Sequence, residues 1–273
     1  NEFRATKRGD ELKYGDAPAG YADQPDEVIS YVDAHDNETL FDSLTFKLPV
    51  ATTMQDRVRM NSLSLATTAL SQSPSFWHAG ADLLRSKSLD RNSYDSGDWF
   101  NRLDWTGADN GFGHGLPPQE QNSAKWPFMK PLLGNSALKP TAADVRAADA
   151  MAQDLLRLRF STKLFRLGNA EAINAKVSFP VSGTADAKQG VIVMRVDDTV
   201  GVDADPALRG LVVVFNATPR TVTQKVPGLA GPMALSPVQA GGADSVVKQA
   251  SYDAGAGTFS VPARTVAVFV QPS

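Results

Sequence analysis

The order of elements predicted between residues 28 and 78 constrains the fold of this chain more than any other feature. Residues 28–34 alternate with a period of two and are rich in β-branched and aromatic side chains, which predicts a buried strand. Residues 53–56 resemble the start of a helix of about four to five turns, and residues 75–78 are a second short strand. A strand, a helix and a strand joined by such a crossover predict a parallel β/α unit.

Two further regions follow this unit. Residues 80–140 are dense in Gly, Asp, Asn, Ser and Pro, and all four tryptophans fall in or beside this segment, which argues against disorder. An apolar stripe and a cap formed by Thr141 and Asp144 predict a second helix over residues 141–159.

The pattern changes beyond about residue 168. Short runs of β-forming residues follow one another, separated by turns rich in Gly, Pro and Asp. This spacing predicts an antiparallel sandwich. The predicted strands are 177–179, 190–196, 211–216, 221–226, 245–252, 258–261 and 265–270.

Two adjacent polar residues, His35 and Asp36, stand where the first predicted strand ends. In barrel enzymes, polar groups at the C-terminal ends of parallel strands carry the chemistry. The structural alternative is that Asp36 caps the following turn while His35 is hydrogen-bonded in the core. The pair is therefore a candidate site that needs further support.

A second pair, Asp98 and Arg102, has the four-residue spacing that lets both side chains face one ligand from a helical turn. An Asp and an Arg together can hydrogen-bond vicinal hydroxyls, and the neighbouring Trp99 and Phe100 offer apolar faces to sugar rings. The alternative is an ordinary surface ion pair. If the first interpretation holds, the ligand is a carbohydrate.

The candidate residues lie within two longer blocks. Residues 31–42, YVDAHDNETLFD, resemble the last sequence motif of glycoside hydrolase family 13, in the form typical of pullulanases and plant limit dextrinases. Residues 78–104 are similar to the segment after the eighth barrel strand of the same enzymes. Shorter similarities occur at 115–118, 126–127 and 261–269, so the resemblance covers nearly the whole chain from about Gly20.

The resemblance implies an α/β plus all-β fold, the C-terminal portion of a (β/α)8 barrel followed by an antiparallel β-sandwich. We expect a loop over residues 1–21 and the last β/α units with a long loop over 22–160. The sandwich is expected over 168–273. The other six strands of the barrel would be missing from this chain.

The resemblance also implies roles for the candidate residues. Asp36 matches the carboxylate that stabilises the oxocarbenium-like transition state at the −1 subsite, and His35 matches a His that binds the same glucose. Asp98 and Arg102 match a pair that holds the next glucose. We add three aromatic residues that would shape the sugar cleft, namely Trp99, Phe100 and Trp105.

The implied activity is retaining hydrolysis of α-1,6-glucosidic linkages, as in starch and pullulan debranching. Retaining glycosidases need two more carboxyl groups, about 5–5.5 Å apart, as nucleophile and acid. In the family these lie at the ends of the fourth and fifth strands, and nothing before Val28 resembles such a strand. We therefore expect this chain alone to be inactive. Its partners would be an α-glucan (pullulan or branched dextrin) and either the missing N-terminal part of the enzyme or a second chain.

The amino-acid composition excludes several classes of functional site and of binding partner. The absence of cysteine excludes a Cys nucleophile, thiolate metal sites and disulfides. A net charge of −3 gives no reason to expect nucleic acid, and no apolar run approaches the length of a membrane helix. The start at Asn1, without Met, looks like an interior cut or a processed end. The implied chemistry needs no cofactor and no catalytic metal. A structural calcium in the intact enzyme is compatible with the resemblance. The compartment would be extracellular or cell-envelope in a bacterium and plastid in a plant.

Two other classes of function stay open. His35, Asp36 and His78 all stand at predicted strand ends and could form the metal site of a metallohydrolase, although their spacing does not favour it. The tryptophan-rich segment and the sandwich would also suit a non-catalytic carbohydrate-binding or packing module. His114, between two glycines, is most simply a loop residue.

Overall fold

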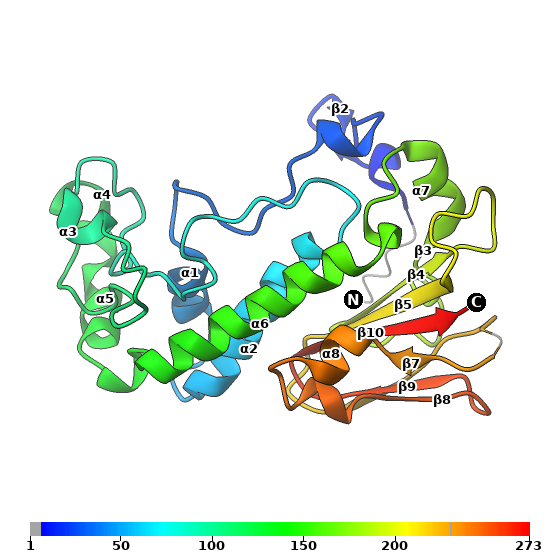
Figure 1. Cartoon of the computed structure of the whole chain (residues 1–273). Coiled ribbons are helices and arrows are strands. Elements are labelled where there is room, and N and C mark those ends of the chain that lie inside the picture. The colour runs from blue at the N-terminus through cyan, green and yellow to red at the C-terminus, as the bar shows by residue number, and fades with distance from the viewer. Residues whose placement is uncertain (1–6, 230) are drawn as a thin grey trace. The chain divides into compact units, whose positions relative to one another are not determined.

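The computed structural model describes residues 7–229 and 231–273. The chain divides into two compact units that interrupt each other along the sequence (Figure 1). The first unit comprises the described residues of 1–30, 69–74 and 156–273. The second comprises residues 31–68 and 75–155 and contains every candidate site residue.

Helices dominate the second unit, and two of them begin where the sequence predicts. Helix α2 (Met54–Ala69) follows Thr53, whose Oγ1 accepts a hydrogen bond from the Asp56 backbone at 3.2 Å. Helix α6 (Ala142–Ser161) follows Thr141, whose backbone N–H donates to Asp144 Oδ2 at 2.8 Å. Both caps satisfy N–H groups that a helix start leaves without partners.

A helix that the sequence analysis did not predict, α1 (Leu40–Lys47), follows the candidate residues His35 and Asp36. Thr39 caps it by accepting a hydrogen bond from the Asp42 backbone at 3.2 Å. Thr39 and Asp42 have the spacing of a capping box, so a local signal for this helix was present.

The long segment 80–140 is ordered around an apolar core. It carries short helical elements, which are α3 (Asp98–Asn101), α4 (Gln119–Asn122), η3 (Ser123–Lys125), α5 (Trp126–Leu133) and η4 (Ser136–Leu138). Their core includes Phe41 of α1, Val58 of α2 and Val145 of α6. The expectation that this segment is not disordered is confirmed.

No strand forms at 28–34 or 75–78, where each segment holds a single bridge residue, Ser30 and Ser75, and this corrects the expected β/α unit. Ile29, Tyr31 and Phe76 are 61%, 60% and 49% exposed, so the large apolar side chains of these segments are not buried as predicted. A strand is stabilised by hydrogen bonds to neighbouring strands, and an alternating pattern cannot supply those neighbours. The barrel portion of the expected fold therefore stays a prediction.

The first unit contains the predicted antiparallel strands, arranged in two sheets. The five-stranded sheet has the order β3 (Val177–Ser178), β4 (Val191–Asp197), β5 (Leu208–Asn216), β10 (Thr265–Pro272) and β7 (Ala234–Leu235). The three-stranded sheet has the order β6 (Val222–Lys225), β9 (Thr258–Val261) and β8 (Ser251–Asp253). Every neighbouring pair is antiparallel.

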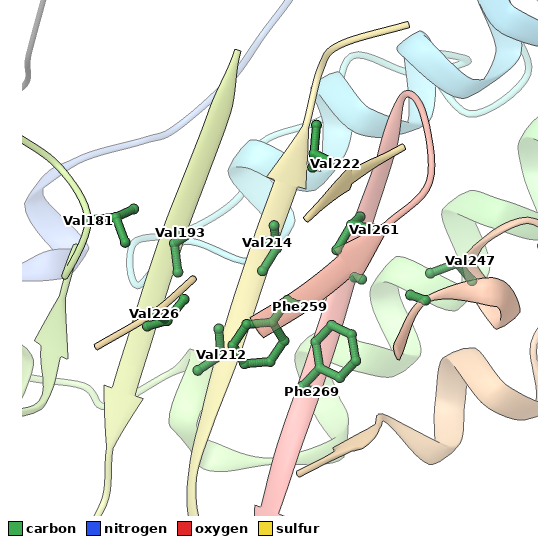
Figure 2. Packing of buried hydrophobic residues seen from close by; sticks show 12 residues of the cluster. Val181, Val193, Val212, Val214, Val222, Val226, Val247, Phe259, Val261 and Phe269 are labelled. Atoms are coloured by element: carbon green, nitrogen blue, oxygen red, sulfur yellow. The ribbon is translucent and has the colours of Figure 1, made fainter. Parts of the chain in front are cut away.

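The two sheets share one apolar core, which Figure 2 shows from close by. Val212 and Val214 of β5 and Phe269 of β10 face Phe259 and Val261 of β9 in this core. The rings of Phe259 and Phe269 lie 4.8 Å apart between their centres. Side chains from both inner faces thus interlock as expected for a sandwich.

Smaller elements complete the first unit. They are η1 (Gly9–Glu11), β1 (Lys13–Tyr14), β2 (Ala17–Pro18), η2 (Pro25–Glu27), η5 (Lys163–Phe165), α7 (Ala170–Lys176), α8 (Pro237–Gly241) and η6 (Val247–Gln249). The strand predicted over 245–252 is wrong for most of its length, because η6 occupies its middle. Asp244 accepts a hydrogen bond from the Val246 backbone at 2.9 Å, a local turn that competes with an extended conformation. Strand β7 was not predicted.

Candidate functional site

His35 and Asp36 project from an exposed turn in the second unit. Their side chains are 86% and 77% exposed, and His35 Nδ1 lies 3.2 Å from Asp36 Oδ1. The next residue, Asn37, has a φ of 61°, a left-handed conformation that Asn tolerates better than most residues. The chain therefore reverses after Asp36 and leaves both side chains accessible to a ligand.

A buried carboxylate anchors this turn from beneath. Asp33 Oδ2 accepts a hydrogen bond from the backbone N–H of Leu40, the first residue of α1, at 3.0 Å. His78 Nδ1 lies 3.6 Å from the same oxygen. The start of α1 and His78 thus fix the segment that precedes His35.

Lys87 holds the turn from a second direction. Its Nζ donates a hydrogen bond to the backbone carbonyl of His35 at 2.9 Å, and its side chain is buried. Burial lowers the pKa of Lys87, and nearby carboxylates, Asp90 foremost, oppose that shift. Sequence reasoning missed Lys87, because a lysine is almost never fully buried unless it is paired.

The helical turn that the spacing of Asp98 and Arg102 predicted is present. Asp98 begins α3, and the Arg102 backbone N–H donates to the Asp98 carbonyl at 2.8 Å. The Arg102 guanidinium lies 3.7 Å from a different carboxylate, that of Asp109, and is more than half exposed. Both side chains of the predicted pair are therefore available to a ligand.

Trp99, which lies between Asp98 and Arg102 in the sequence, is held in place by His114. Its indole N–H donates to the His114 carbonyl at 2.8 Å, and its ring lies 4.8 Å from the His114 ring at an angle of 31°. Trp99 and Trp105 are 59% and 71% exposed, whereas Phe100 is half-buried. His114, expected to be an ordinary loop residue, supports one of the predicted sugar-binding side chains.

Asp109 organises this cluster. Its Oδ2 lies 2.7 Å from His114 Nε2, and its Oδ1 lies 3.2 Å from Lys139 Nζ. Burial raises the pKa of Asp109, but hydrogen bonds from the Gly111 backbone, His114 and Lys139 outweigh burial and lower it to about 2. Asp109 is therefore ionised at neutral pH and holds His114 in place.

Comparisons with known proteins decide the family. The description "Alpha-1,6-glucosidases, pullulanase-type, C-terminal" matches residues 107–272, more than half of the chain. The chain belongs to the pullulanase-type α-1,6-glucosidase family. Its matching region is the C-terminal domain of that family.

Relatives of this pullulanase-type chain include a plant and a bacterial enzyme. "Pullulanase 1, chloroplastic" of Arabidopsis thaliana is 43% identical over 99% of the chain, which spans 29% of that relative. The pullulanase of Klebsiella pneumoniae is 39% identical over 98% of the chain, which spans 24% of it. The chain thus corresponds to less than a third of these relatives.

Solved structures agree in fold. The ligand-free PulA of Klebsiella pneumoniae matches 98% of the chain with a TM-score of 0.89 and 37% identity, and the chain spans 25% of it. A structure described as a maltotriose complex of PulA matches equally well, with a TM-score of 0.89 and 37% identity. Here the chain covers 29% of the solved protein.

The pullulanase-type chain does not bring its two candidate pairs into direct contact. Among the described residues, no hydrogen bond or ion pair joins His35 or Asp36 to Asp98 or Arg102. Arg85 connects the two regions indirectly. Its Nη1 lies 3.3 Å from His78 Nε2, and its Nη2 donates to the carbonyl of Asn101 at the end of α3.

Metal and membrane sites are not found in the described part of the pullulanase-type chain. Within residues 7–229 and 231–273, no group of three or more His, Cys, Asp or Glu side chains can hold a metal ion. The metallohydrolase interpretation of His35, Asp36 and His78 gains no support from this arrangement. None of the helices in these ranges has the length and apolar character needed to cross a bilayer.

The low pKa of Asp109 predicts an acid-dependent loss of stability. The folded pKa of about 2 lies below the usual value of 3.8, so Asp109 stabilises the fold above pH 4 and loses that contribution as the pH falls toward 2. The full effect is about 2 kcal/mol. Unfolding curves of the Asp109→Asn variant should lack this part of the acid dependence. Identical curves for both proteins between pH 4 and 2 would contradict the assignment.

Proposed function

We propose that this chain is the C-terminal part of an enzyme that hydrolyses α-1,6-glucosidic linkages in pullulan and branched α-glucans with retention. The similarity to a pullulanase solved with maltotriose, at a TM-score of 0.89 over 98% of the chain, carries this proposal. Because the chain spans less than a third of its relatives, the activity belongs to the larger protein.

Asp36 would stabilise the positive charge that develops on the −1 glucose. Its carboxylate is exposed, with His35 as its hydrogen-bonding neighbour, so both can face a bound sugar. A glucan that covers the turn would exclude water and strengthen the attraction between the carboxylate and the oxocarbenium-like transition state. His35 would hydrogen-bond the same glucose.

The next glucose would lie against α3. Asp98 can accept and Arg102 can donate hydrogen bonds to vicinal hydroxyls, and one helical turn presents them together. Trp99 leaves one face open, because the His114 ring covers the other. Phe100 and Trp105 would complete the apolar walls of the sugar cleft.

The nucleophile and the general acid would come from a preceding part of the enzyme. Buried carboxylates in this chain are already engaged in its own structure, as Asp33, Asp42 and Asp90 illustrate. That preceding part would also supply the remaining strands of a (β/α)8 barrel, against which residues 28–34 and 75–78 would pair. A structural calcium in the intact enzyme stays a prediction.

Activity measurements on the full-length protein test the proposal. The full-length protein should release reducing ends from pullulan, and proton NMR should detect the α-anomer first, as retention requires. The isolated 273-residue chain should release none. Turnover by the rigorously purified chain, or glucan retention on an affinity gel without turnover by the full-length protein, would overturn the proposal.

The apolar side chains on the predicted barrel segments imply a covering partner. Tyr31 and Phe76 are each about half exposed or more, and their ring centres lie 6.5 Å apart, which is a costly exposure for neighbouring large apolar groups. We expect residues 22–160 to exchange amide hydrogens much more slowly in the full-length protein than in the chain alone. Residues 168–273 should be protected in both. Equal protection of 22–160 in a dilute monomer of the chain would contradict the need for a partner.

The location of the enzyme would follow its source. Its relatives include a chloroplastic plant pullulanase and bacterial pullulanases. We propose a plastid location for a plant source, and the cell envelope or the exterior for a bacterial one.

A further inference from the structure

A buried turn with an uncommon backbone conformation lies between the two candidate pairs. In this turn, residues 84–89, three residues that are not glycine have positive φ angles, which are 56° for Leu84, 52° for Ser88 and 66° for Leu89. Such conformations are costly and persist only where the surrounding structure holds them. We call residues 84–89 the brace turn.

Asp42 of α1 holds the brace turn in this conformation. Asp42 is fully buried, and its Oδ2 accepts hydrogen bonds from the backbone N–H groups of Lys87 at 2.8 Å and Leu89 at 3.2 Å. Its Oδ1 accepts a hydrogen bond from the Ser86 hydroxyl. One carboxylate thus satisfies three donors of the turn and offsets the cost of its backbone conformation.

Two cationic side chains of the brace turn donate hydrogen bonds to main-chain carbonyls next to the two candidate pairs. Lys87 Nζ donates to the His35 carbonyl at 2.9 Å, one residue before Asp36. Arg85 Nη2 donates to the Asn101 carbonyl, one residue before Arg102. Each cation therefore holds the backbone beside a predicted sugar-binding side chain, and among the described residues no hydrogen bond or ion pair joins Lys87 to Asp36 or Arg85 to Arg102.

We propose that the brace turn sets the spacing between the −1 and −2 sugar-binding groups, with Lys87 and Arg85 as positioning residues. This inference rests on the proposed function. No hydrogen bond or ion pair joins the two pairs within the described residues, so their separation depends on intermediate groups. A shift of about 1 Å in a group that faces the transition state can lower a rate about 100-fold.

The chemistry of the two cations suits a positioning role. A charged donor makes a stronger hydrogen bond to a carbonyl than a neutral donor does, and a buried ammonium has few alternative partners. Arg85 also donates to the Ala79 carbonyl at 3.2 Å and contacts His78 Nε2, so its guanidinium is fixed from several sides. A side chain without a donor at Lys87 or Arg85 would remove the hydrogen bond to the carbonyl of His35 or of Asn101.

Variants of the full-length enzyme test this inference. Lys87→Met keeps the apolar stem and removes the donor, and should lower kcat on pullulan about 10- to 100-fold with KM changed less than about threefold. Arg85→Met should instead raise KM about tenfold, because it displaces the binding groups of the −2 glucose. Lys87→Arg should recover part of the lost kcat. Lys130→Met is the matched control, because Lys130 is an exposed lysine of the same unit.

The outcomes separate this inference from the proposed function. Normal kcat and KM in Lys87→Met, alongside an inactive Asp36→Asn, would overturn the positioning role and leave the proposed function intact. Normal turnover in Asp36→Asn would overturn the proposed function itself. If Lys87→Met fails to fold, Lys87→Gln provides the same test, because its side chain is one bond shorter and carries no charge. A crystal structure of the folded variant should show the 35–36 peptide displaced, and an unmoved peptide would contradict the inference.

Discussion

We expect the replacement of Asp36 by Asn in the full-length enzyme to lower kcat on pullulan about 100- to 1,000-fold and to leave its folding unchanged. The expected loss comes from the missing negative charge, since Asn matches Asp in shape but cannot offset the charge of an oxocarbenium-like transition state. The carboxylate makes no hydrogen bond to the main chain of another element among the described residues, and it is 77% exposed. Its removal should therefore cost little stability.

Steady-state kinetics and thermal melting of the same preparation check this result. KM should change much less than kcat, because the affected interaction strengthens in the transition state. Asp203→Asn, which changes an exposed carboxylate in the first unit, is the control and should behave as the unaltered enzyme. Normal kcat in a folded Asp36→Asn enzyme would remove Asp36 from the catalytic machinery.

Local signals made the two long helices predictable from sequence. Thr53 and Thr141 each cap a helix through a residue three positions away, and such short-range hydrogen bonds depend only on neighbouring residues. The same signal at Thr39 starts α1, which the sequence analysis does not predict, because the pattern of residues 28–36 favours a strand that ends at His35 and Asp36.

Most strand predictions succeeded where the partner strands lie within the chain, the one over 245–252 being the exception. Val212 and Val214 alternate along β5, and their pairing partners on β4 and β10 are present in the same unit. The segment 28–34 alternates in the same way, and the segment 75–78 is a short apolar run, but neither forms a strand. An alternating sequence indicates which side chains would face the core and which would face solvent. A strand forms only when neighbouring strands provide hydrogen bonds.

The exposed residues of the candidate site were predictable from sequence, whereas the buried residues that hold them in place were not. The family resemblance pointed to Asp36, Asp98 and Arg102, and their contacts with ligand stay predictions. Lys87 meets His35 across 52 residues, and Asp42 meets Ser86 across 44. No pattern in a single sequence indicates pairs that are so far apart, so the brace turn could emerge only from the structure.

Replacing Asp42 by Ala should destabilise the region around the brace turn by about 3–5 kcal/mol. Ala leaves the Ser86 hydroxyl and the backbone N–H groups of Lys87 and Leu89 buried without their acceptor. Native-state hydrogen exchange in the full-length enzyme measures this directly, through the amides of Lys87 and Leu89. Asp95→Ala, which removes an exposed carboxylate from the same unit, is the control.

The pH dependence of this loss identifies its cause. Burial raises the pKa of Asp42 from 3.8 to about 6, although hydrogen bonds from Ser86, Lys87 and Leu89 oppose the shift. The folded state therefore binds a proton more tightly than the unfolded state, and the stability that Asp42 contributes falls as the pH rises from 4 to 6. The difference between the unaltered enzyme and Asp42→Ala should then be larger at pH 4 than at pH 7, by at most about 3 kcal/mol. A difference that grows with rising pH would mean that the charge of Asp42, and not its burial, dominates the brace turn.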